Sequence, residues 1–177
     1  MQTFETARLL IRPLSIEDRE FYCSCYTDPL LMQHIGEPLS HEAASQSFKA
    51  ALRITGKTPI RRYTWAMQEK TTRSNIGLLA LVCDQVQPEP INAEIGSIVC
   101  LHFQNQGFAA EAISALVDVA LANTSLSTLS TRHISQNGAA YGLMEKLGFQ
   151  YEVEQLASGA SFKWQLHRTE WQKLQAR

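Results

Sequence analysis

The fold of this chain is decided by one stretch, Val99-Cys100-Leu101-His102-Phe103-Gln104-Asn105-Gln106-Gly107-Phe108-Ala109-Ala110-Glu111-Ala112. An apolar run enters a short polar turn, and a single glycine stands where an apolar stripe over residues 107–123 predicts a long helix. The first turn of a helix leaves backbone N–H groups without partners, and the helix dipole adds positive character there. A strand-to-helix turn of this kind can bind a pyrophosphate without any basic side chain.

The turn itself, from Gln104 to Gly107, contains neither Lys nor Arg. It is not a Walker loop, which requires G-x-x-x-x-G-K-[ST], and it is not the G-x-G-x-x-G dinucleotide turn. The sequence therefore lacks the motifs that would best support nucleotide hydrolysis or hydride transfer. Two interpretations of Gly107 remain, an anion-binding turn and a glycine that merely permits a tight turn.

Helical and strand patterns alternate on both sides of this stretch. Runs rich in β-branched, aromatic and apolar residues predict strands at residues 7–14, 62–69, 76–83, 93–101, 128–134, 149–154 and 162–166. Capping residues and helical spacing predict helices at residues 16–26, 41–52, 107–123 and 137–146, with Ser15 as a cap and Gly148 as a stop. Pro88 and Pro90 predict a hairpin loop over residues 85–92. The pattern predicts a mixed α/β (α+β) sheet with helices on both faces.

The composition predicts one domain over residues 1–177. The chain has 16 Lys and Arg against 17 Asp and Glu, which gives a formal net charge of −1. Nucleic-acid binders neutralise several phosphates with clustered cations, so this balance argues against a nucleic-acid partner. No apolar run reaches the roughly 20 residues of a membrane-spanning helix, and the N-terminus lacks signal-peptide features, so a cytoplasmic protein without a membrane partner is expected. The four cysteines have no zinc-site spacing, and no metal is expected.

Several segments together resemble one enzyme superfamily. Gln104-x-x-Gly107-x-Ala109 resembles the Q/R-x-x-G-x-G/A acyl-CoA signature of the GNAT superfamily of N-acetyltransferases. Residues 5–14 are similar to the opening T-x-R-L-x-L-R strand of the RimJ/RimL branch, the ribosomal-protein N-terminal acetyltransferases. Residues 107–112 resemble the G-Y-A-T-E-A stretch of that branch, and Asn137 followed by residues 147–149 resembles its N-x-x-S…L-G-F segment.

The resemblance implies a splayed central sheet of about six or seven strands. Strands four and five, here residues 93–101 and 128–134, would part to hold acetyl-CoA. The backbone amides that would hold the pyrophosphate are those of Gln106, Gly107, Phe108 and Ala109, with Gln104 and Asn105 shaping the turn. The pantetheine arm would pair with strand four from Val99 to Leu101.

Asn137 has two expected roles that do not exclude each other. The resemblance implies that its side chain bonds the pantetheine arm, whereas its position before a helix predicts an N-cap. The basic residue that relatives have in the turn is Gln106 here. The group that holds the 3′-phosphate of CoA is therefore open, with Arg73, Arg132 and His133 as candidates.

The resemblance implies a carboxylate near the start of strand four that takes the proton of the amine, and Glu94 is the candidate. The alternative for Glu94 is a solvated strand-edge side chain. Glu111 is expected to support the start of its helix instead. The acids of relatives are missing, because Ala140 stands at the serine position of the branch and Met144 at the tyrosine position of the superfamily. Tyr141 is a possible substitute, and half-buried packing is its alternative.

Two functions follow from the resemblance. The first is transfer of an acetyl group from acetyl-CoA to a primary amine by direct attack, the acceptor being a protein N-terminal amine or a small molecule. The second is a non-catalytic CoA-binding sensor or interaction module of the same fold, which the missing acid favours. A homodimer is expected by analogy with the family. Acidic residues of the first half could attract a cationic acceptor, namely Glu17, Asp18, Asp28, Glu37 and Glu42.

Overall fold

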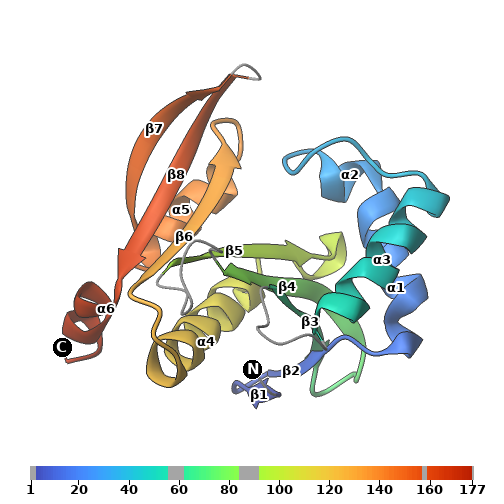
Figure 1. The fold of residues 1–177 in the computed structure, drawn as a ribbon, viewed down its shortest axis with the longest axis horizontal. Coiled ribbons are helices and arrows are strands. Elements are labelled where there is room, and N and C mark those ends of the chain that lie inside the picture. Colours follow the sequence, from blue (N-terminus) through green and yellow to red (C-terminus); the bar gives the residue numbers. More distant parts are fainter. Residues whose placement is uncertain (1–2, 56–61, 84–91, 157–158, 177) are drawn as a thin grey trace.

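The computed structural model describes residues 3–55, 62–83, 92–156 and 159–176 (Figure 1). In this part of the chain eight strands form one sheet in the order β1-β2-β3-β4-β5-β6-β8-β7. The strands are β1 (Phe4–Glu5), β2 (Leu9–Pro13), β3 (Arg62–Glu69), β4 (Asn75–Cys83), β5 (Asn92–Val99), β6 (Thr128–Ile134), β7 (Gln150–Leu156) and β8 (Gly159–His167). Neighbouring strands are antiparallel except for β5 and β6, which are parallel.

Helices cover both faces of the sheet, which confirms the predicted fold class. The helices are α1 (Arg19–Thr27), α2 (Pro29–Met32), α3 (His41–Thr55), α4 (Phe108–Asn123), α5 (Gly138–Lys146) and α6 (Arg168–Gln175), with two 3₁₀ turns, η1 (Ile16–Asp18) and η2 (Leu101–Phe103). On one face, Phe48 of α3 and Tyr22 of α1 pack against Leu78 and Ile98 of the sheet. On the other face, α4 buries the apolar stripe that predicted it.

The strands β5 and β6 part soon after they meet. Their parallel pairing comprises Asn92 with Thr128, Ala93 with Leu129, and Glu94 with Ser130. Beyond Glu94, β5 continues to Val99 and stays paired with β4 only, while β6 continues to Ile134 beside β8. In Figure 1, β6 rises with β7 and β8 away from β5, and α1 to α3 lie on the opposite side of the opening. The splay that the resemblance implied is therefore present.

The element boundaries differ from the predicted ones where turns compete with strands and helices. The strand predicted over 93–101 ends at Val99, because the Phe103 N–H turns back to the Cys100 carbonyl and Leu101 starts η2. The sheet has eight strands rather than six or seven, since the two-residue β1 pairs with Leu10 and Ile11.

The remaining predictions concern the other helices and the loop over residues 85–92. Where a single helix was predicted over 16–26, η1 is followed directly by α1, and α2 and α6 were not predicted. Gly148, with a φ of 80°, ends α5 as expected. The predicted hairpin loop lies almost entirely outside the described residues, although its flanking strands β4 and β5 are antiparallel. Among the described residues, no helix has the length and apolar character needed to cross a membrane.

Candidate active site

The turn between β5 and α4 is held by its own side chains. Gln104 Nε2 donates to the Val99 carbonyl at 2.9 Å, and Gln106 Nε2 donates to the His102 carbonyl at 2.7 Å. Asn105 and Gly107 have φ values of 59° and 81°, in the left-handed region. The two glutamines thus satisfy carbonyls of the turn and fix its shape.

Helix α4 begins without a side-chain cap. Gly107 is its N-cap residue, and the Glu111 N–H makes the first helical bond, to the Gly107 carbonyl at 3.1 Å. The N–H groups of Phe108 and Ala109 precede that bond, so the helix offers them no carbonyl of its own. The positive end of the α4 dipole and these donors therefore lie together at the turn.

Arg8 of the N-terminal segment braces the turn through three contacts of its guanidinium group. Its Nε lies 2.6 Å from Glu111 Oε2, its Nη1 donates to the Gln106 carbonyl at 2.9 Å, and its Cζ lies 4.2 Å from the ring centroid of Phe108. Thr6 Oγ1 and the Arg8 backbone N–H also donate to Glu111. Partial burial raises the pKa of Glu111, but the bonds from Thr6 and Arg8 lower it below its usual value. Glu111 therefore supports the start of α4, as expected.

A cavity of about 800 Å³ opens in front of the turn. The first residues of α5 form its opposite wall. It is lined by most of the expected cofactor-binding residues, namely Val99, Leu101, Gln104, Asn105, Gly107, Phe108, Ala109 and Asn137. Gln106 is not among the lining residues, because its side chain and carbonyl are engaged behind the turn. We call this space the turn cavity.

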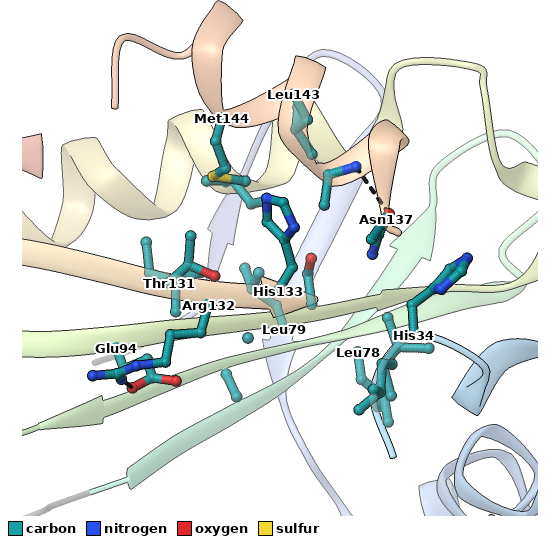
Figure 2. Close-up of a pocket in the computed structure, with 18 of the residues that line it drawn as sticks. His34, Leu78, Leu79, Glu94, Thr131, Arg132, His133, Asn137, Leu143 and Met144 are labelled. Carbon is teal, nitrogen blue, oxygen red and sulfur yellow. Dashed lines mark hydrogen bonds and ion pairs between the residues drawn. The ribbon is translucent and has the colours of Figure 1, made fainter. Parts of the chain in front are cut away.

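A second cavity of about 450 Å³ continues the first one between the parted strands. Glu94 and Ile95 of β5, Thr131 and Arg132 of β6, and Met144 of α5 contribute to its wall (Figure 2). We call it the splay cavity. The lining residues shared by the two cavities are His34, Ile35, Ser97, Ile98, Asn137, Ala140 and Leu143. The two cavities thus form one passage through the splay.

Glu94 stands where β5 and β6 separate. Its Oε2 lies 2.6 Å from Nη1 of Arg132, and the two side chains are 45% and 41% exposed. Figure 2 shows this ion pair at one end of the splay cavity, with Asn137 at the other. Glu94 is therefore both close to solvent and in the cavity, and the guanidinium of Arg132 is its closest described charge partner.

Asn137 caps α5, since its Oδ1 accepts from the Ala140 N–H at 3.0 Å. The two hydrogens on its Nδ2 are not used by that cap. Because Asn137 also lines both cavities, the two roles expected for it are compatible in position.

Tyr141 faces away from both cavities. Its ring centroid lies 5.0 Å from Trp164, 5.3 Å from Phe162 and 5.5 Å from Tyr151. A hydrogen bond with the Tyr151 hydroxyl raises the pKa of Tyr141. Half-buried packing, the alternative expected for Tyr141, is the arrangement found. Tyr141 is not among the lining residues of either cavity.

His133 is buried with both ring nitrogens engaged. Trp164 Nε1 donates to Nε2 of His133 at 2.8 Å, so this nitrogen carries no proton, and Nδ1 donates to the Ile134 carbonyl at 2.9 Å. The ring therefore lies in the wall of the splay cavity as a neutral, fixed group.

The candidates for the 3′-phosphate lie away from the turn. Arg132 and His133 line the splay cavity, and Arg73 closes the bend between β3 and β4. Lys146, in the last turn of α5, lines the turn cavity instead. Sequence reasoning missed Lys146, although a basic residue just before Leu147-Gly148-Phe149 was a visible signal.

The acidic residues considered for a cationic acceptor do not line either cavity. Asp18 is buried and paired with Arg12, and Asp28 caps α2 through the Leu30 N–H. Glu17, Glu37 and Glu42 do not line the splay cavity. Within the described ranges, no three His, Cys, Asp or Glu side chains are grouped so that they could hold a metal ion.

Comparisons with known proteins agree with this geometry. The profile of the acetyltransferase (GNAT) domain matches residues 8–150. The chain belongs to the GNAT acetyltransferase family. A relative of the GNAT domain described here is the uncharacterized N-acetyltransferase YoaA of Bacillus subtilis (strain 168), 29% identical over 153 residues, or 84% of this chain and 82% of that protein.

Solved structures share the fold of this GNAT domain. RimL, a ribosomal L7/L12 alpha-N-protein acetyltransferase in complex with CoA, has a TM-score of 0.81 and 13% identity over 94% of this chain and 98% of its own. The spermidine N-acetyltransferase of Vibrio cholerae, in complex with CoA and spermine, has a TM-score of 0.79 and 18% identity over 94% of this chain and 99% of its own. At these identities the likeness concerns the fold, and it does not distinguish one branch of the family from another.

Proposed function

We propose that this protein is an acetyl-CoA-dependent N-acetyltransferase that acts on a primary amine. The observation that carries the proposal is the passage through the splay, with the uncapped start of α4 at one end and the carboxylate of Glu94 at the other. Acetyl transfer from acetyl-CoA to an amine requires a site that binds the phosphates of CoA and a group that accepts the proton of the amine.

The turn cavity fits the CoA part of the substrate. Its volume of about 800 Å³ is in the range of small-molecule sites, and Phe108 and Ala109, the first residues of α4, line its wall. From Ile95 to Val99, the β6-facing edge of β5 has no strand partner among the described residues. An extended pantetheine arm can pair with such an edge. Lys146 supplies a positive charge in the same cavity for the 3′-phosphate.

The transfer step is direct attack. The amine nitrogen forms a bond to the thioester carbonyl carbon, the C–S bond breaks, and the nitrogen loses one proton while the thiolate gains one. In our proposal Glu94 receives the proton from nitrogen, directly or through water. The ion pair with Arg132 holds the carboxylate of Glu94 at the point where the strands part.

The thiolate proton has no side-chain donor at the positions that relatives use. Ala140 lines both cavities where the branch has a serine, and Met144 is buried where the superfamily has a tyrosine. Because Tyr141 faces the aromatic cluster, we propose that solvent protonates the departing thiolate.

The acceptor is proposed to be a protein N-terminal amine, in line with the RimJ/RimL-like motifs at residues 5–14 and 107–112. A small-molecule amine is the alternative, since a spermidine acetyltransferase has the same fold. A cytoplasmic location and a homodimer complete the proposal, and cell fractionation and sedimentation velocity are the measurements that check them.

A non-catalytic CoA-binding module is the second candidate function. The absence of a hydroxyl at Ala140 and Met144, and the ion pair that engages Glu94, favour it. A module of this kind would bind CoA and would not release it from acetyl-CoA.

The test measures CoA release from acetyl-CoA with peptides of different N-terminal residues and with spermidine. We expect turnover with at least one amine, and we expect Glu94→Gln to lower kcat by about 100-fold while the Kd for CoA stays unchanged. Glu170→Gln is the matched control, because Glu170 pairs with Lys173 on α6 and does not line either cavity. CoA binding without turnover would establish the module, and failure to bind CoA would reject both functions.

A further inference from the structure

The imidazole of His34 lies at the junction of the two cavities. His34 follows α2, and among the described residues it is the only ionisable side chain that lines both the turn cavity and the splay cavity. Asn137 and Ala140, from the start of α5, line both cavities as well. The middle of the passage is therefore bordered by the start of α5 and by the segment that carries His34.

The backbone around His34 is held in a closed turn. The Met32 carbonyl accepts from the Ile35 N–H at 2.8 Å, and the Leu39 N–H donates to the Tyr26 carbonyl of α1 at 2.8 Å. The Met32 side chain is buried, which fixes the end of α2 to the rest of the fold. These contacts on both sides of His34 position its side chain at the junction.

The ring of His34 is accessible and unengaged. The residue is half-buried, and no hydrogen bond or ion pair joins its ring to another residue in the described ranges. His133, the other histidine of the passage, has both ring nitrogens engaged by Trp164 and the Ile134 carbonyl. In Figure 2 the ring of His34 lies toward the Asn137 side of the pocket. Both nitrogens of His34 can therefore serve a molecule in the passage.

The sulfur of acetyl-CoA is the atom expected at this point. A thioester with its phosphates at the start of α4 and its carbonyl facing Glu94 must cross the junction. In acetyl-CoA the sulfur is bonded to that carbonyl on the phosphate side. The sulfur therefore lies in the middle of the passage, where His34 lines both cavities.

Other possible proton donors of the passage are less suited to the sulfur. Lys146 lines the turn cavity only. Tyr26 lines the splay cavity only, and burial together with a hydrogen bond to Tyr22 raises the pKa of Tyr26. Ser97 lines both cavities, but histidine is the side chain that commonly gains and loses a proton near neutral pH.

We propose that His34 is the catalytic residue that protonates the sulfur as the C–S bond breaks. This inference rests on the proposed function and names the path by which the solvent proton reaches the thiolate. The imidazolium of His34 gives one proton to the sulfur, which leaves as a thiol, and the neutral imidazole regains a proton from water. Glu94 takes one proton from the amine, so the protons balance. The two groups lie at different ends of the splay cavity (Figure 2).

The experiment has a binding arm and a kinetic arm. Calorimetry gives the Kd of CoA and of desulfo-CoA, in which hydrogen replaces the thiol, for the wild type, His34→Ala and His41→Ala. Turnover of acetyl-CoA is measured for the same proteins and for Ser97→Ala, with the best amine for the wild type, and with and without added imidazole. His41 is the matched control, since it is the first residue of α3 and lines neither cavity.

We expect the wild type to bind CoA about 3- to 10-fold more tightly than desulfo-CoA, and His34→Ala to lose this preference without a change in the Kd of desulfo-CoA. The kcat of His34→Ala should fall about 10- to 100-fold, and imidazole should restore part of it. His41→Ala should match the wild type in both arms. The thermal midpoint of His34→Ala should stay unchanged, because no described hydrogen bond is lost.

Three results would overturn the proposal while the proposed function stands. They are an unchanged kcat in His34→Ala, a loss of kcat that imidazole does not restore with the preference for CoA retained, and a larger loss in Ser97→Ala than in His34→Ala. A wild type that binds CoA without turning over any amine, or that does not bind CoA, would reject the proposed function and this inference with it.

Discussion

At the scale of single residues, the turn that faces the turn cavity depends on a backbone conformation that only glycine adopts easily. Gly107 has a φ of 81°, and a Cβ placed there would lie 3.4 Å from Nη2 of Arg8. A left-handed conformation costs a residue with a side chain about 1 to 2 kcal/mol. An added methyl group would also contact the arginine that braces the turn. The turn and its brace are therefore coupled at this position.

We predict that Gly107→Ala weakens CoA binding by about 10-fold, because the strained turn moves its N–H groups away from the pyrophosphate. Isothermal titration calorimetry with CoA measures the effect. Gly36→Ala is the control, since Gly36 has open space around its Cβ position and does not line either cavity. An unchanged Kd in Gly107→Ala would contradict the role of the turn.

A second residue-scale prediction concerns Asp18, whose carboxylate is 2% exposed. Arg12 reaches both of its oxygens at 2.7 and 2.8 Å, and the Ser15 N–H and Asn75 Nδ2 also donate to it. Burial raises the pKa of Asp18, but the bonds from Arg12 and Ser15 outweigh burial and lower it to about 2. We expect Asp18→Asn to lower the free energy of unfolding by about 2 to 3 kcal/mol, measured in urea at pH 7.

The pH dependence of this effect has a definite sign. Because the folded pKa of Asp18 lies below its unfolded value of 3.8, its stabilisation is complete above that value and is lost as the pH falls toward 2. The unfolding free energies of the wild type and Asp18→Asn should therefore converge between pH 5 and pH 2, as tracked by urea titrations at successive pH values. Glu17→Gln, a change at the exposed neighbouring acid, should leave the stability close to that of the wild type. A constant gap across that range would show that the ion pair is not the source.

Single residues also show what the sequence could and could not predict. Gly107 and Asn137 were found because a turn residue and a cap stand at fixed places beside periodic segments. The pairing of Glu94 with Arg132 crosses 38 residues and depends on the register of β5 and β6.

At the scale of elements, the N-terminal segment acts as a brace for the turn between β5 and α4. Arg8 joins Glu111, the Gln106 carbonyl and the Phe108 ring, so three points of the turn and the first turn of α4 are fixed by one planar group. Lysine cannot reproduce this, because an ammonium lacks the forked donors and the flat face of a guanidinium.

We therefore predict that Arg8→Lys weakens CoA binding by about 3- to 10-fold, although Arg8 lies outside both cavity walls. The Kd for CoA and the thermal midpoint are the measurements. Arg19→Lys is the control, since Arg19 bonds only a serine hydroxyl of α3 among the described contacts. If Arg8→Lys lowers the midpoint and leaves the Kd unchanged, the brace stabilises the fold and does not position the turn.

Some helices and strands were predicted with nearly correct bounds, and others were missed. Periodicity found β3, β6 and α4 with nearly the observed bounds, because long apolar patterns dominate there. It missed α2 and α6, since short or polar helices are specified by tertiary contacts. Helix α6 is held by Trp171, which donates to Asp118, and by Arg168, which donates to the carbonyls of Leu121, Thr124 and Leu126. These contacts lie more than 40 residues apart in the chain, so a local pattern does not reveal them.

At the scale of the whole molecule, two parts of the sheet meet through only three residue pairs of β5 and β6. The parting of these two strands followed from the resemblance rather than from the periodicity, because local patterns do not determine how neighbouring strands are arranged. Below the splay, however, one hydrophobic cluster joins both parts. It contains Trp65 of β3, Leu116 of α4, Leu129 of β6, and Trp164 of β8.

This shared core leads to our last prediction, that the protein unfolds in a single transition and that CoA shifts the whole of it. In Trp65→Phe, the two remaining tryptophans, Trp164 and Trp171, report on the C-terminal side alone, while far-UV circular dichroism reports on all helices and strands. Their urea midpoints should coincide. CoA at 100 times its Kd should raise the unfolding free energy by about 2.7 kcal/mol for both probes, because ligand bound across the splay stabilises both parts together. Separate midpoints, or a CoA shift confined to one probe, would mean that the splay divides the molecule into units that fold independently, with the candidate active site at the junction between them.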